Sequence, residues 1–468
     1  MSSPEIIAID QAVEAARVAS RQWAESDATV RSSLLDALAD ALEQHQTDLI
    51  ALADLETNLG TARLTGEVAR TAFQLRGFAR EVRDGVPYQR VDDEAVAGAP
   101  PAGRPALSRV QEPLGPVAMF SASNFPFAFS VLGGDTASAL AAGCPVVVKA
   151  HSGHPQLSKA VHAVASQVLA NCGLPAGLLG LVEGASRAAG THLVTHPDIS
   201  AVAFTGSFQG GTALWKAAND RPRPIPFFGE LGSINPLLAL PEVLEKNGEA
   251  LASTLASSIT MGCGQFCTSP GVIVLFDHPA SDRFVDQLCT TLRPLPTHAM
   301  LTPGMRQGFE SGVAHLAASP QARLLFEPPA DSAGPAPRLF EVNTEAFIAD
   351  PTLREEMFGP AAVVLKIRSV EQAVEVFSAI GGSLTATLWG LDHDTAQNRT
   401  LIHAARQVAG RVLFAGVPTG VAVCHAQEHG GPWPASTRPE TTSVGYAALQ
   451  RFLRPVALQD APAWLQPR

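Results

Sequence analysis

The chain has 468 residues, of which 46% are hydrophobic and 16% are charged, and this composition excludes a disordered or fibrous protein. The formal net charge of −11 argues against a surface for nucleic acid or anionic lipid. Six cysteines are too few for a disulfide scaffold, no apolar run is long enough to cross a bilayer, and the start MSSPEIIAID lacks the features of a secretory signal. We therefore expect a reduced, cytoplasmic, globular protein of roughly two to four domains.

The first part of the chain, up to about residue 90, is expected to be helical scaffold. Leu35, Leu38 and Leu42 fall on one helical face there. The stretch from Val91 to Pro105 is rich in Ala, Gly and Pro and is expected to be a loop.

After this loop, short β-branched runs alternate with helical ones, which is typical of a parallel doubly wound sheet. The predicted strands are Gly115–Phe120, Pro145–Lys149, Gly177–Val182 and Ser200–Phe204, and the predicted helices are Phe129–Ala142 and Ser158–Asn171. Pro222–Pro226 breaks the pattern, and we expect a domain boundary near Leu231. The clearest strands beyond it are Val272–Phe276, Ala361–Ile367, Leu384–Trp389 and Arg411–Phe414. The tail carries an edge-like strand at Arg451–Pro455, which needs a partner in this subunit or in a neighbour.

In a doubly wound sheet the ligand lies beyond the carboxyl ends of the strands. The segments at those ends are small and polar: Ser121 to Asn124, Lys149 to Ser152, Gly184 to Arg187 and Thr205 to Gly211. Gly206 and Gly211 would let a pyrophosphate approach a helix N-terminus, although the same spacing also suits an ordinary strand-to-helix turn. Lys149 could donate to a ribose or a phosphate, or it could be a solvated strand end.

Three further segments carry groups suited to catalysis. The run MGCGQFCTSPG presents Cys267 among small and polar residues, which favours a nucleophilic thiol over an inert buried cysteine. In FGELG, burial would raise the pKa of Glu230 and make it a usable general base, unless the residue caps a helix or forms an ion pair. Asn124 offers an amide for an oxyanion, or merely forms a turn. Glu356, on a turn before a strand, suits two ribose hydroxyls or belongs to a simple loop.

We predict no resident metal ion. Cys263 and Cys267 lack a second Cys/His pair with ligand spacing. His425 and His429 lie beside Cys424, but their Gly and Pro neighbours favour a structural loop. Cys263 and Cys267 could instead form a thiol redox sensor.

Six motifs occur in one order along the chain: SASNFP, VVVKA, FTGS, FGELGSINP, GQFCTSPG and EMFGP. Together they resemble the aldehyde dehydrogenase superfamily over nearly the whole length. The resemblance implies an α/β fold with a Rossmann-type doubly wound cofactor domain, an α/β catalytic domain and a small β-ribbon for oligomerisation. The corresponding ranges are 1–96 and 112–230 for the cofactor domain, 231–424 for the catalytic domain, 97–111 and 440–468 for the oligomerisation element, and 425–439 for a segment returning to the cofactor domain. A homodimer or homotetramer is implied.

The resemblance also implies residue roles. Cys267 matches the nucleophile, Glu230 the general base and Asn124 the oxyanion donor. The expected cofactor contacts are Ser121, Ser123, Lys149, Ser152, Arg187, Thr205, Gly206, Ser207, Gly211, Leu231, Glu356 and Phe358. The expected substrate pocket consists of Phe125, Phe127, Phe266 and Thr268. In this chemistry the thiolate adds to an aldehyde, hydride leaves to the nicotinamide, and water hydrolyses the thioester; the retained glutamate disfavours transfer to coenzyme A.

Two departures refine the expectation. Many NAD-preferring members carry a glutamate three residues after the strand-end lysine, whereas Ser152 stands there in this chain, and Arg187 falls where it could pair with a 2′-phosphate. We therefore expect NADP as the preferred cofactor, with NAD possible. The closing segments resemble the branch that oxidises 2-oxoglutarate semialdehyde and its NADP-dependent fatty-aldehyde relatives. The alternatives are a dehydrogenase of medium or long aliphatic aldehydes, with Phe125, Phe127 and Phe266 lining an apolar tunnel, and a non-catalytic dinucleotide-binding protein of the same fold.

Overall fold

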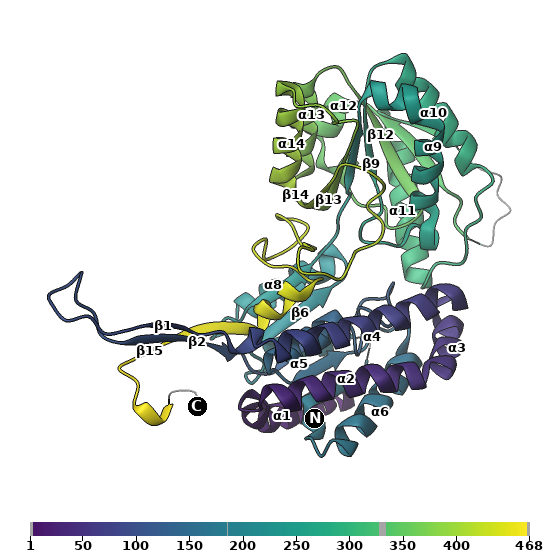
Figure 1. Ribbon diagram of the computed structural model, residues 1–468. Coiled ribbons are helices and arrows are strands. Elements are labelled where there is room, and N and C mark those ends of the chain that lie inside the picture. The colour runs from purple at the N-terminus through teal and green to yellow at the C-terminus, as the bar shows by residue number, and fades with distance from the viewer. Residues whose placement is uncertain (1–2, 185, 327–333, 466–468) are drawn as a thin grey trace.

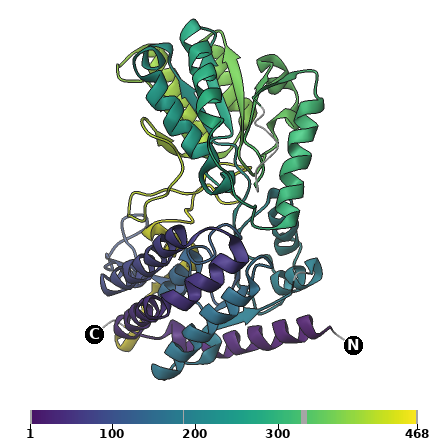
Figure 2. The ribbon, with the colours of Figure 1, turned by 90° about the vertical axis from the view of Figure 1, so that its right-hand side faces the viewer.

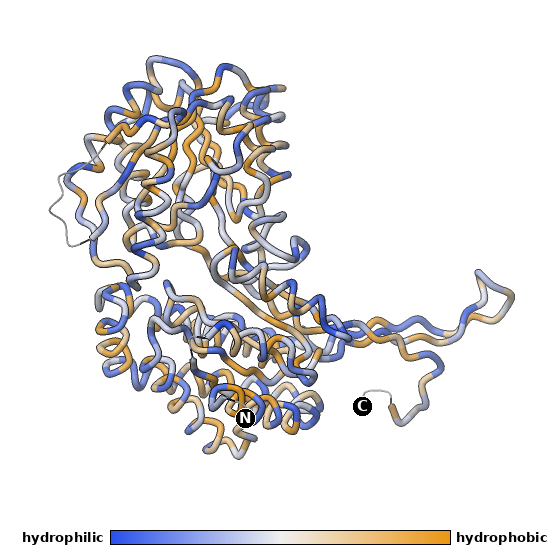
Figure 3. Tube along the Cα trace, turned by 180° about the vertical axis from the view of Figure 1, so that it is seen from behind, coloured by the Kyte–Doolittle hydropathy of each residue, from blue (hydrophilic) through white to orange (hydrophobic). Residues whose placement is uncertain are grey.

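The computed structural model describes residues 3–184, 186–326 and 334–465. Two α/β units lie one above the other in Figure 1, and a β-ribbon projects sideways from the lower unit. Apolar residues concentrate in the interior of each unit, as the hydropathy colouring in Figure 3 shows. Each unit contains a mainly parallel sheet with helices packed on it, so the expected α/β class is confirmed. Among the described residues, no helix combines the length and hydropathy needed to span a bilayer.

The lower unit is built on a five-stranded parallel sheet with the strand order β5-β4-β3-β6-β7. Its strands are β3 (Val117–Phe120), β4 (Val146–Lys149), β5 (Leu179–Val182), β6 (Ala201–Thr205) and β7 (Phe227–Glu230). The four strands predicted from β-branched runs are confirmed to within two residues at each end. The fifth, β7, is not among the predicted strands because its run Phe-Phe-Gly-Glu contains no β-branched residue.

Helices cover both faces of this sheet because its side chains alternate between two apolar layers. Val117 and Met119 pack into a core with helices α2 to α6, whereas Ala118 and Phe120 pack against α1, α7 and α8. The bounds are α1 (Pro4–Ala24), α2 (Ala28–Gln44), α3 (Gln46–Thr57), α4 (Thr61–Arg83), α5 (Gly134–Ala142), α6 (Pro155–Asn171), α7 (Arg187–Thr195) and α8 (Phe208–Asn219). The helical scaffold expected at the start of the chain is thus confirmed as α1 to α4.

The upper unit contains, in the described part of the chain, a seven-stranded sheet of order β10-β11-β12-β9-β8-β13-β14 that is parallel except at β10. The strands are β8 (Pro236–Ala239), β9 (Val272–Phe276), β10 (Ala322–Phe326), β11 (Arg338–Val342), β12 (Ala361–Ile367), β13 (Ser383–Trp389) and β14 (Ala409–Leu413). Helices α9 (Pro241–Thr260) and α10 (Pro279–Leu292) cover one face, and α12 (Thr344–Ala349), α13 (Val370–Ile380) and α14 (Ala396–Val408) cover the other. The remaining helix, α11 (Pro303–Ala318), contributes Leu316 to the second layer.

Short 3-10 helices connect several of these elements. They are η1 (Val86–Tyr88), η2 (Ala176–Leu178), η3 (Met261–Gly264), η4 (Pro351–Arg354), η5 (Tyr446–Phe452) and η6 (Ala463–Leu465). Of these, η3 leads into the segment that carries Cys267.

The β-ribbon joins the two distant ends of the sequence. It is an antiparallel sheet of β1 (Val91–Asp93), β2 (Leu107–Pro113) and β15 (Leu453–Gln459), and it extends well beyond the lower unit (Figure 1). The expectation of a loop over Val91–Asp93 is wrong, because these residues pair with β2. The expected terminal strand is confirmed, and its partner is β2 of the same chain. A role for the ribbon in assembly stays a prediction.

The chain between β14 and β15 returns from the upper unit to the lower one, and Figures 1 and 2 show it in yellow-green between the two units. This return segment pairs with the end of β7 through a bridge between Glu230 and Ser436. The Leu231 N–H donates to the Ala435 carbonyl oxygen at 2.8 Å. Residues near 430 are thereby held at the carboxyl end of the lower sheet.

The end of the return segment is anchored by a buried ion pair. Arg451 Nη2 lies 2.6 Å from Asp135 Oδ1, and the two side chains are 2% and 8% exposed. We predict that Arg451→Ala lowers the free energy of unfolding by about 3–5 kcal/mol, because the Asp135 carboxylate would stay buried without its counter-ion. Urea denaturation of both proteins measures this loss.

The matched control for this prediction is Arg438→Ala. Arg438 pairs with Glu440 at 3.4 Å, but the two side chains are 44% and 60% exposed. Its removal should cost at most about 1 kcal/mol. Equal losses in the two variants would contradict the assignment of the Arg451 pair as the anchor.

Candidate active site

Two residues from separate segments meet at the carboxyl end of the lower sheet. Glu230 is the last residue of β7, and Cys267 lies in the turn between η3 and β9. Glu230 is 3% exposed and Cys267 is partly buried. The strand end and the turn are joined by Asn235, whose side-chain N–H₂ donates to the Cys267 carbonyl oxygen at 2.8 Å.

The turn that carries Cys267 depends on Gly264. This residue has a φ of +66°, and a Cβ at this position would lie 2.2 Å from the carbonyl carbon of Gly359. Only glycine therefore lets the Cys267 turn press against the loop that contains Glu356 and Phe358. Ser269 fixes the same turn, since its hydroxyl donates to the Gly264 carbonyl oxygen at 3.0 Å.

His429 from the return segment lies between the two catalytic candidates. Its Nε2 atom is 3.5 Å from the Cys267 sulfur and 3.1 Å from Glu230 Oε1. The other carboxylate oxygen of Glu230 accepts a hydrogen bond of 2.7 Å from the Ser443 hydroxyl. Sulfur, imidazole and carboxylate thus lie in contact at one point, with both contacts made by the same ring nitrogen.

The backbone around His429 explains this placement. Its N–H donates to the Thr442 hydroxyl at 2.8 Å, and its carbonyl oxygen accepts from the Ser443 N–H at 2.9 Å. Gly431 then has a φ of +122°, and a Cβ there would lie 2.4 Å from the Ser383 carbonyl oxygen at the start of β13. The glycine allows the return segment to pass close to the upper sheet, and this fixes the imidazole in a fully buried position.

His429 lies in a loop, as expected, but the sequence did not indicate that its side chain contacts Cys267 and Glu230. The signal in the sequence is weak: a histidine followed by two glycines, far from both residues that it contacts. Ser443 gave no signal at all. The sulfur, the Nε2 atom and a carboxylate oxygen of Glu230 lie within 4.8 Å of one another, a spacing at which a metal ion could also be held. The absence of a resident metal stays a prediction.

The protonation states follow from burial and charge. Burial raises the pKa of the Cys267 thiol well above its ordinary value, and the negative charge of Glu230 raises it further. Burial also raises the pKa of Glu230, but His429 and the Ser443 hydroxyl outweigh this effect and hold that pKa below its ordinary value. The expectation of a raised pKa at Glu230 is thus wrong, because the carboxylate is hydrogen-bonded on both oxygens. The site combines a protonated thiol with an ionised carboxylate.

Asn124 lies beside the Cys267 turn. Its side-chain N–H₂ donates to the Gln265 carbonyl oxygen at 3.0 Å, and the residue is 7% exposed. An amide has two N–H bonds, so one remains for an oxyanion. Thr268, the residue after Cys267, is 1% exposed, and its hydroxyl has no partner among the described residues.

The predicted substrate residues separate into two environments. Phe125 and Phe266 contact each other edge to face, with ring centroids 5.2 Å apart, next to Asn124 and Cys267 in the sequence. Phe127 is 2% exposed and packs in the apolar core of the lower unit, away from any open surface. Its backbone N–H donates to Glu67 at 2.8 Å.

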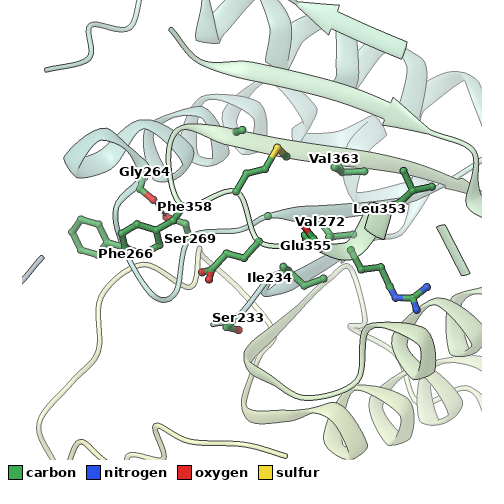
Figure 4. Close-up of a pocket in the computed structure, with 15 residues that line it drawn as sticks. Ser233, Ile234, Gly264, Phe266, Ser269, Val272, Leu353, Glu355, Phe358 and Val363 are labelled. Atoms are coloured by element: carbon green, nitrogen blue, oxygen red, sulfur yellow. Dashed lines mark hydrogen bonds between the residues drawn. The ribbon is translucent and has the colours of Figure 1, made fainter. Parts of the chain in front are cut away.

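A shallow pocket lies against the Cys267 turn. It is lined by residues of that turn and of the loop before β12, including Glu356 and Phe358. Figure 4 shows Phe266 and Phe358 together at one end of the pocket and Leu353 at the other. The Glu356 carboxylate lies against Gly232, one residue beyond Leu231. This pocket is suited to the nicotinamide half of a dinucleotide, since it combines apolar walls with a carboxylate for ribose hydroxyls.

The predicted phosphate turn follows β6. Ser207 caps α8, since its hydroxyl accepts from the Gly210 N–H at 3.2 Å. The Thr205 hydroxyl is buried and has no partner among the described residues. At Gly211 a Cβ would lie 2.1 Å from the Leu231 side chain. A free hydroxyl beside the N-terminus of α8 fits a pyrophosphate.

The region around Lys149, predicted to bind the adenosine ribose, contains a carboxylate that the sequence analysis missed. Lys149, 9% exposed, donates to the carbonyl oxygens of Ala150 and Gly184. The Glu5 carboxylate of α1 lies against Gly184 and accepts a hydrogen bond of 2.5 Å from the Ser186 hydroxyl. A carboxylate thus reaches the neighbourhood of Lys149 although position 152 is serine. No local sequence signal marks Glu5, because it lies 144 residues before the lysine (149 − 5).

The remaining predicted cofactor residues lie in the same region. Ser152 is exposed in the turn after β4, and Arg187 is exposed at the first position of α7. Ser121 is buried and accepts from the Ser130 hydroxyl at 3.2 Å, and the Ser123 hydroxyl contacts the Met305 sulfur at 3.7 Å.

Cys263 is directed to a different environment from Cys267. Its sulfur donates to the His298 carbonyl oxygen at 3.3 Å and packs with Met300 and Phe309. Burial raises the pKa of this thiol to about 11. Both cysteines are free thiols, and the redox-sensor alternative finds no support in their hydrogen bonds.

Comparison with known proteins agrees with this geometry. A model of the aldehyde dehydrogenase family matches residues 5–431. The chain is 44% identical over 463 residues to alpha-ketoglutaric semialdehyde dehydrogenase 2 of Azospirillum brasilense, covering 98% of this chain and 88% of that protein. It is 40% identical over 462 residues to the alpha-ketoglutaric semialdehyde dehydrogenase of Acinetobacter baylyi, with the same coverage. A solved structure of 1-pyrroline-5-carboxylate dehydrogenase from Thermus with bound NAD superposes with a TM-score of 0.81 at 20% identity, covering 96% of this chain and 85% of that one, and shows the shared fold.

The effect of the Glu230 charge on the pKa of Cys267 can be measured. Because the carboxylate opposes ionisation of the thiol, Glu230→Gln should lower the pKa of Cys267. The rate of iodoacetamide labelling at Cys267 can be measured against pH by peptide mass spectrometry. In the variant, this rate should begin to rise at a lower pH than in the wild-type protein. Glu355→Gln, which alters an exposed neighbour of Glu356, is the control and should leave the profile in place. An unchanged or upward-shifted profile in Glu230→Gln would show that the carboxylate does not act on the sulfur.

Proposed function

The chain belongs to the aldehyde dehydrogenase family, and we propose that it oxidises 2-oxoglutarate semialdehyde to 2-oxoglutarate, with NADP preferred and NAD as a second cofactor. The observation that carries the proposal is the convergence of the Cys267 sulfur, the His429 imidazole and the Glu230 carboxylate, with contacts of 3.5 Å and 3.1 Å. These groups supply a nucleophile and a base at one point. A non-catalytic binding protein would not need them together.

The first step is activation of the thiol. The raised pKa of Cys267 means that a base must remove its proton, and the ionised Glu230 carboxylate, within 4.8 Å of the sulfur, would take it. His429 Nε2, which contacts both the sulfur and the carboxylate, would then donate to the thiolate and stabilise it. The sulfur then attacks the aldehyde carbon, and the free N–H of the Asn124 amide donates to the oxyanion.

The acyl group is then released by water. NADP or NAD, when bound, supplies the acceptor for the hydride that leaves the aldehyde carbon, and a thioester to Cys267 results. Glu230, after passing the thiol's proton to solvent, would take a proton from the attacking water, whose hydroxyl adds to the acyl carbon. The C–S bond then breaks, the acid leaves and the sulfur recovers the proton held by Glu230.

The residues proposed to hold the dinucleotide come from the strand ends of the lower sheet and from the loop before β12. Thr205, Gly206, Ser207 and Gly211 would receive the pyrophosphate, and Lys149 the adenosine ribose. Glu356 would accept from the nicotinamide ribose, beside Phe358 and Leu231. Ser121, Ser123 and Ser152 line the approach to these groups.

The substrate class rests on the two relatives named alpha-ketoglutaric semialdehyde dehydrogenases. Medium or long aliphatic aldehydes are the alternative, and the apolar Phe125 and Phe266 rings favour them. However, the Arg63 guanidinium lies 4.7 Å from the centroid of the Phe266 ring. A cation in this position favours an aldehyde with a negatively charged end over an alkyl chain.

A cytoplasmic location and a homodimer or homotetramer joined through the β-ribbon are part of the same proposal.

A panel of aldehydes tests the proposed reaction. We expect the kcat/KM for 2-oxoglutarate semialdehyde to exceed those for succinic semialdehyde, glutaraldehyde and aliphatic aldehydes, with each nicotinamide cofactor. Cys267→Ala should abolish oxidation and leave cofactor binding unchanged, as fluorescence titration would show. A higher kcat/KM for a long aliphatic aldehyde would replace the proposed substrate by the alternative.

Cofactor preference depends on two opposite charges near Lys149. Arg187 would attract a 2′-phosphate, whereas the Glu5 carboxylate would repel it. Arg187→Ala should therefore lower kcat/KM for NADP by about 10-fold more than for NAD, in line with the loss of one charged hydrogen bond. Glu5→Gln is the matched variant and should shift the ratio in the opposite direction. Equal losses for both cofactors in Arg187→Ala would remove this residue from the phosphate site.

A further inference from the structure

One face of helix α4 carries an unusual set of charges toward the active site. Arg63, Glu67 and Arg70 are spaced at i, i+4 and i+7, so they lie along one side of the helix. Figure 1 shows α4 at the top of the lower unit, facing the upper one. Arg76, three turns after Arg63 but on another side, instead forms ion pairs with Asp40 and Glu43 at the outer surface.

Arg63 reaches the two aromatic rings beside Cys267. Its guanidinium carbon is 5.1 Å from the Phe125 centroid and 4.7 Å from the Phe266 centroid. Its Nη2 atom donates to the Asn124 carbonyl oxygen at 2.6 Å. The Nη1 atom is buried and has no partner in the described part of the chain. One donor of a cation is thus left free next to the proposed oxyanion site.

Arg70 lies two turns after Arg63 on α4 and contacts the return segment. Its Nη1 atom donates to the Val421 carbonyl oxygen, and its buried Nε atom has no partner among the residues described. Arg411 of β14 holds the same loop from the other side, through the carbonyl oxygens of Pro418 and Gly420. Burial lowers the pKa of Arg70, and the charges of Glu67 and of the Cys267 thiolate oppose this shift.

Among the described residues, the face of α4 with Arg63, Glu67 and Arg70 has more positive than negative charge. Glu67 is the carboxylate between the two arginines, and its Oε1 accepts from the N–H groups of Phe127 and Ala128 at 2.8 and 3.0 Å. Burial raises the pKa of Glu67 to about 6. One carboxylate, already hydrogen-bonded to backbone, faces two guanidiniums, so the face stays cationic in a chain whose net charge is −11. Half-buried cations with free donors are a site for an anion.

From this geometry we infer that Arg63 and Arg70 form the subsite for the carboxylate of the substrate, so that they determine the preference for a 2-oxo acid semialdehyde over an alkyl aldehyde. The inference rests on the proposed function, and it assigns the residues that recognise the far end of that substrate. In 2-oxoglutarate semialdehyde the carboxylate carbon is separated from the aldehyde carbon by four single bonds of about 1.5 Å each, roughly 5 Å in an extended chain. The Arg63 guanidinium contacts Phe266, the residue before Cys267, so a carboxylate held there would direct the aldehyde toward the sulfur.

The test compares two aldehydes of equal chain length, 2-oxoglutarate semialdehyde and pentanal, in the full-length enzyme with saturating NADP. The measured quantity is the ratio of their kcat/KM values, because general damage to the active site lowers both and cancels. We expect Arg70→Met and Arg63→Met each to lower this ratio by about 10- to 100-fold, the range for loss of a charge-assisted hydrogen bond. Arg70→Lys should recover part of it.

Arg76→Met is the matched control, since it removes an arginine from the same helix at the outer surface, and it should leave the ratio unchanged. If the wild-type enzyme prefers 2-oxoglutarate semialdehyde and both methionine variants keep the full ratio, the subsite is overturned and the proposed substrate stands. If the wild-type enzyme shows no preference, the proposed substrate fails and the subsite fails with it.

A second measurement needs no variant. Glutarate and pentanoate have five carbons each and differ by one carboxylate, so both can be tested as inhibitors competitive with the aldehyde in the wild-type enzyme. We expect glutarate to bind at least about 10-fold more tightly, since its second carboxylate would reach the two arginines. Equal inhibition constants would overturn the subsite.

Discussion

The contact on which the active site depends is the one between the His429 imidazole and its two neighbours, the Cys267 sulfur and the Glu230 carboxylate. A thiol and a carboxylate alone would oppose each other, because the negative charge of Glu230 disfavours the thiolate. The His429 ring lies between them and contacts both groups. The three groups come from three segments, and each needs its own support to remain within hydrogen-bond distance.

That support comes from close backbone approaches. The Cys267 turn presses on the Gly359 loop through Gly264, and the return segment passes near β13 through Gly431. Both contacts exclude a side chain, and both join elements that lie far apart in the sequence. The buried pair of Arg451 and Asp135 then ties the end of the return segment to α5. The geometry of the site is thus a consequence of how the two units pack on the return segment.

The helices of the lower unit supply charges as well as scaffold. Helix α1 brings Glu5 next to Gly184, which the strand-end lysine contacts, and α4 brings Arg63 to the aromatic pair beside Cys267 and Arg70 to the return segment. These charges lie at opposite ends of the region assigned to cofactor and aldehyde. The helical layer has no catalytic motif of its own. It carries a carboxylate at one end and two guanidiniums at the other, and such charges are suited to selecting ligands.

The sequence by itself determined the strands β3, β4, β9 and β12, because their β-branched runs are buried on both faces and leave a strong local pattern. It also determined Cys267, Glu230 and Asn124 as candidates, since short motifs and their order along the chain identify them. Only the tertiary structure decided the lowered pKa of Glu230, the role of His429 and the positions of Glu5, Arg63 and Arg70. These depend on contacts between residues at least 61 positions apart, up to 351 for Arg70 and Val421, and such contacts leave no periodicity or spacing in the chain.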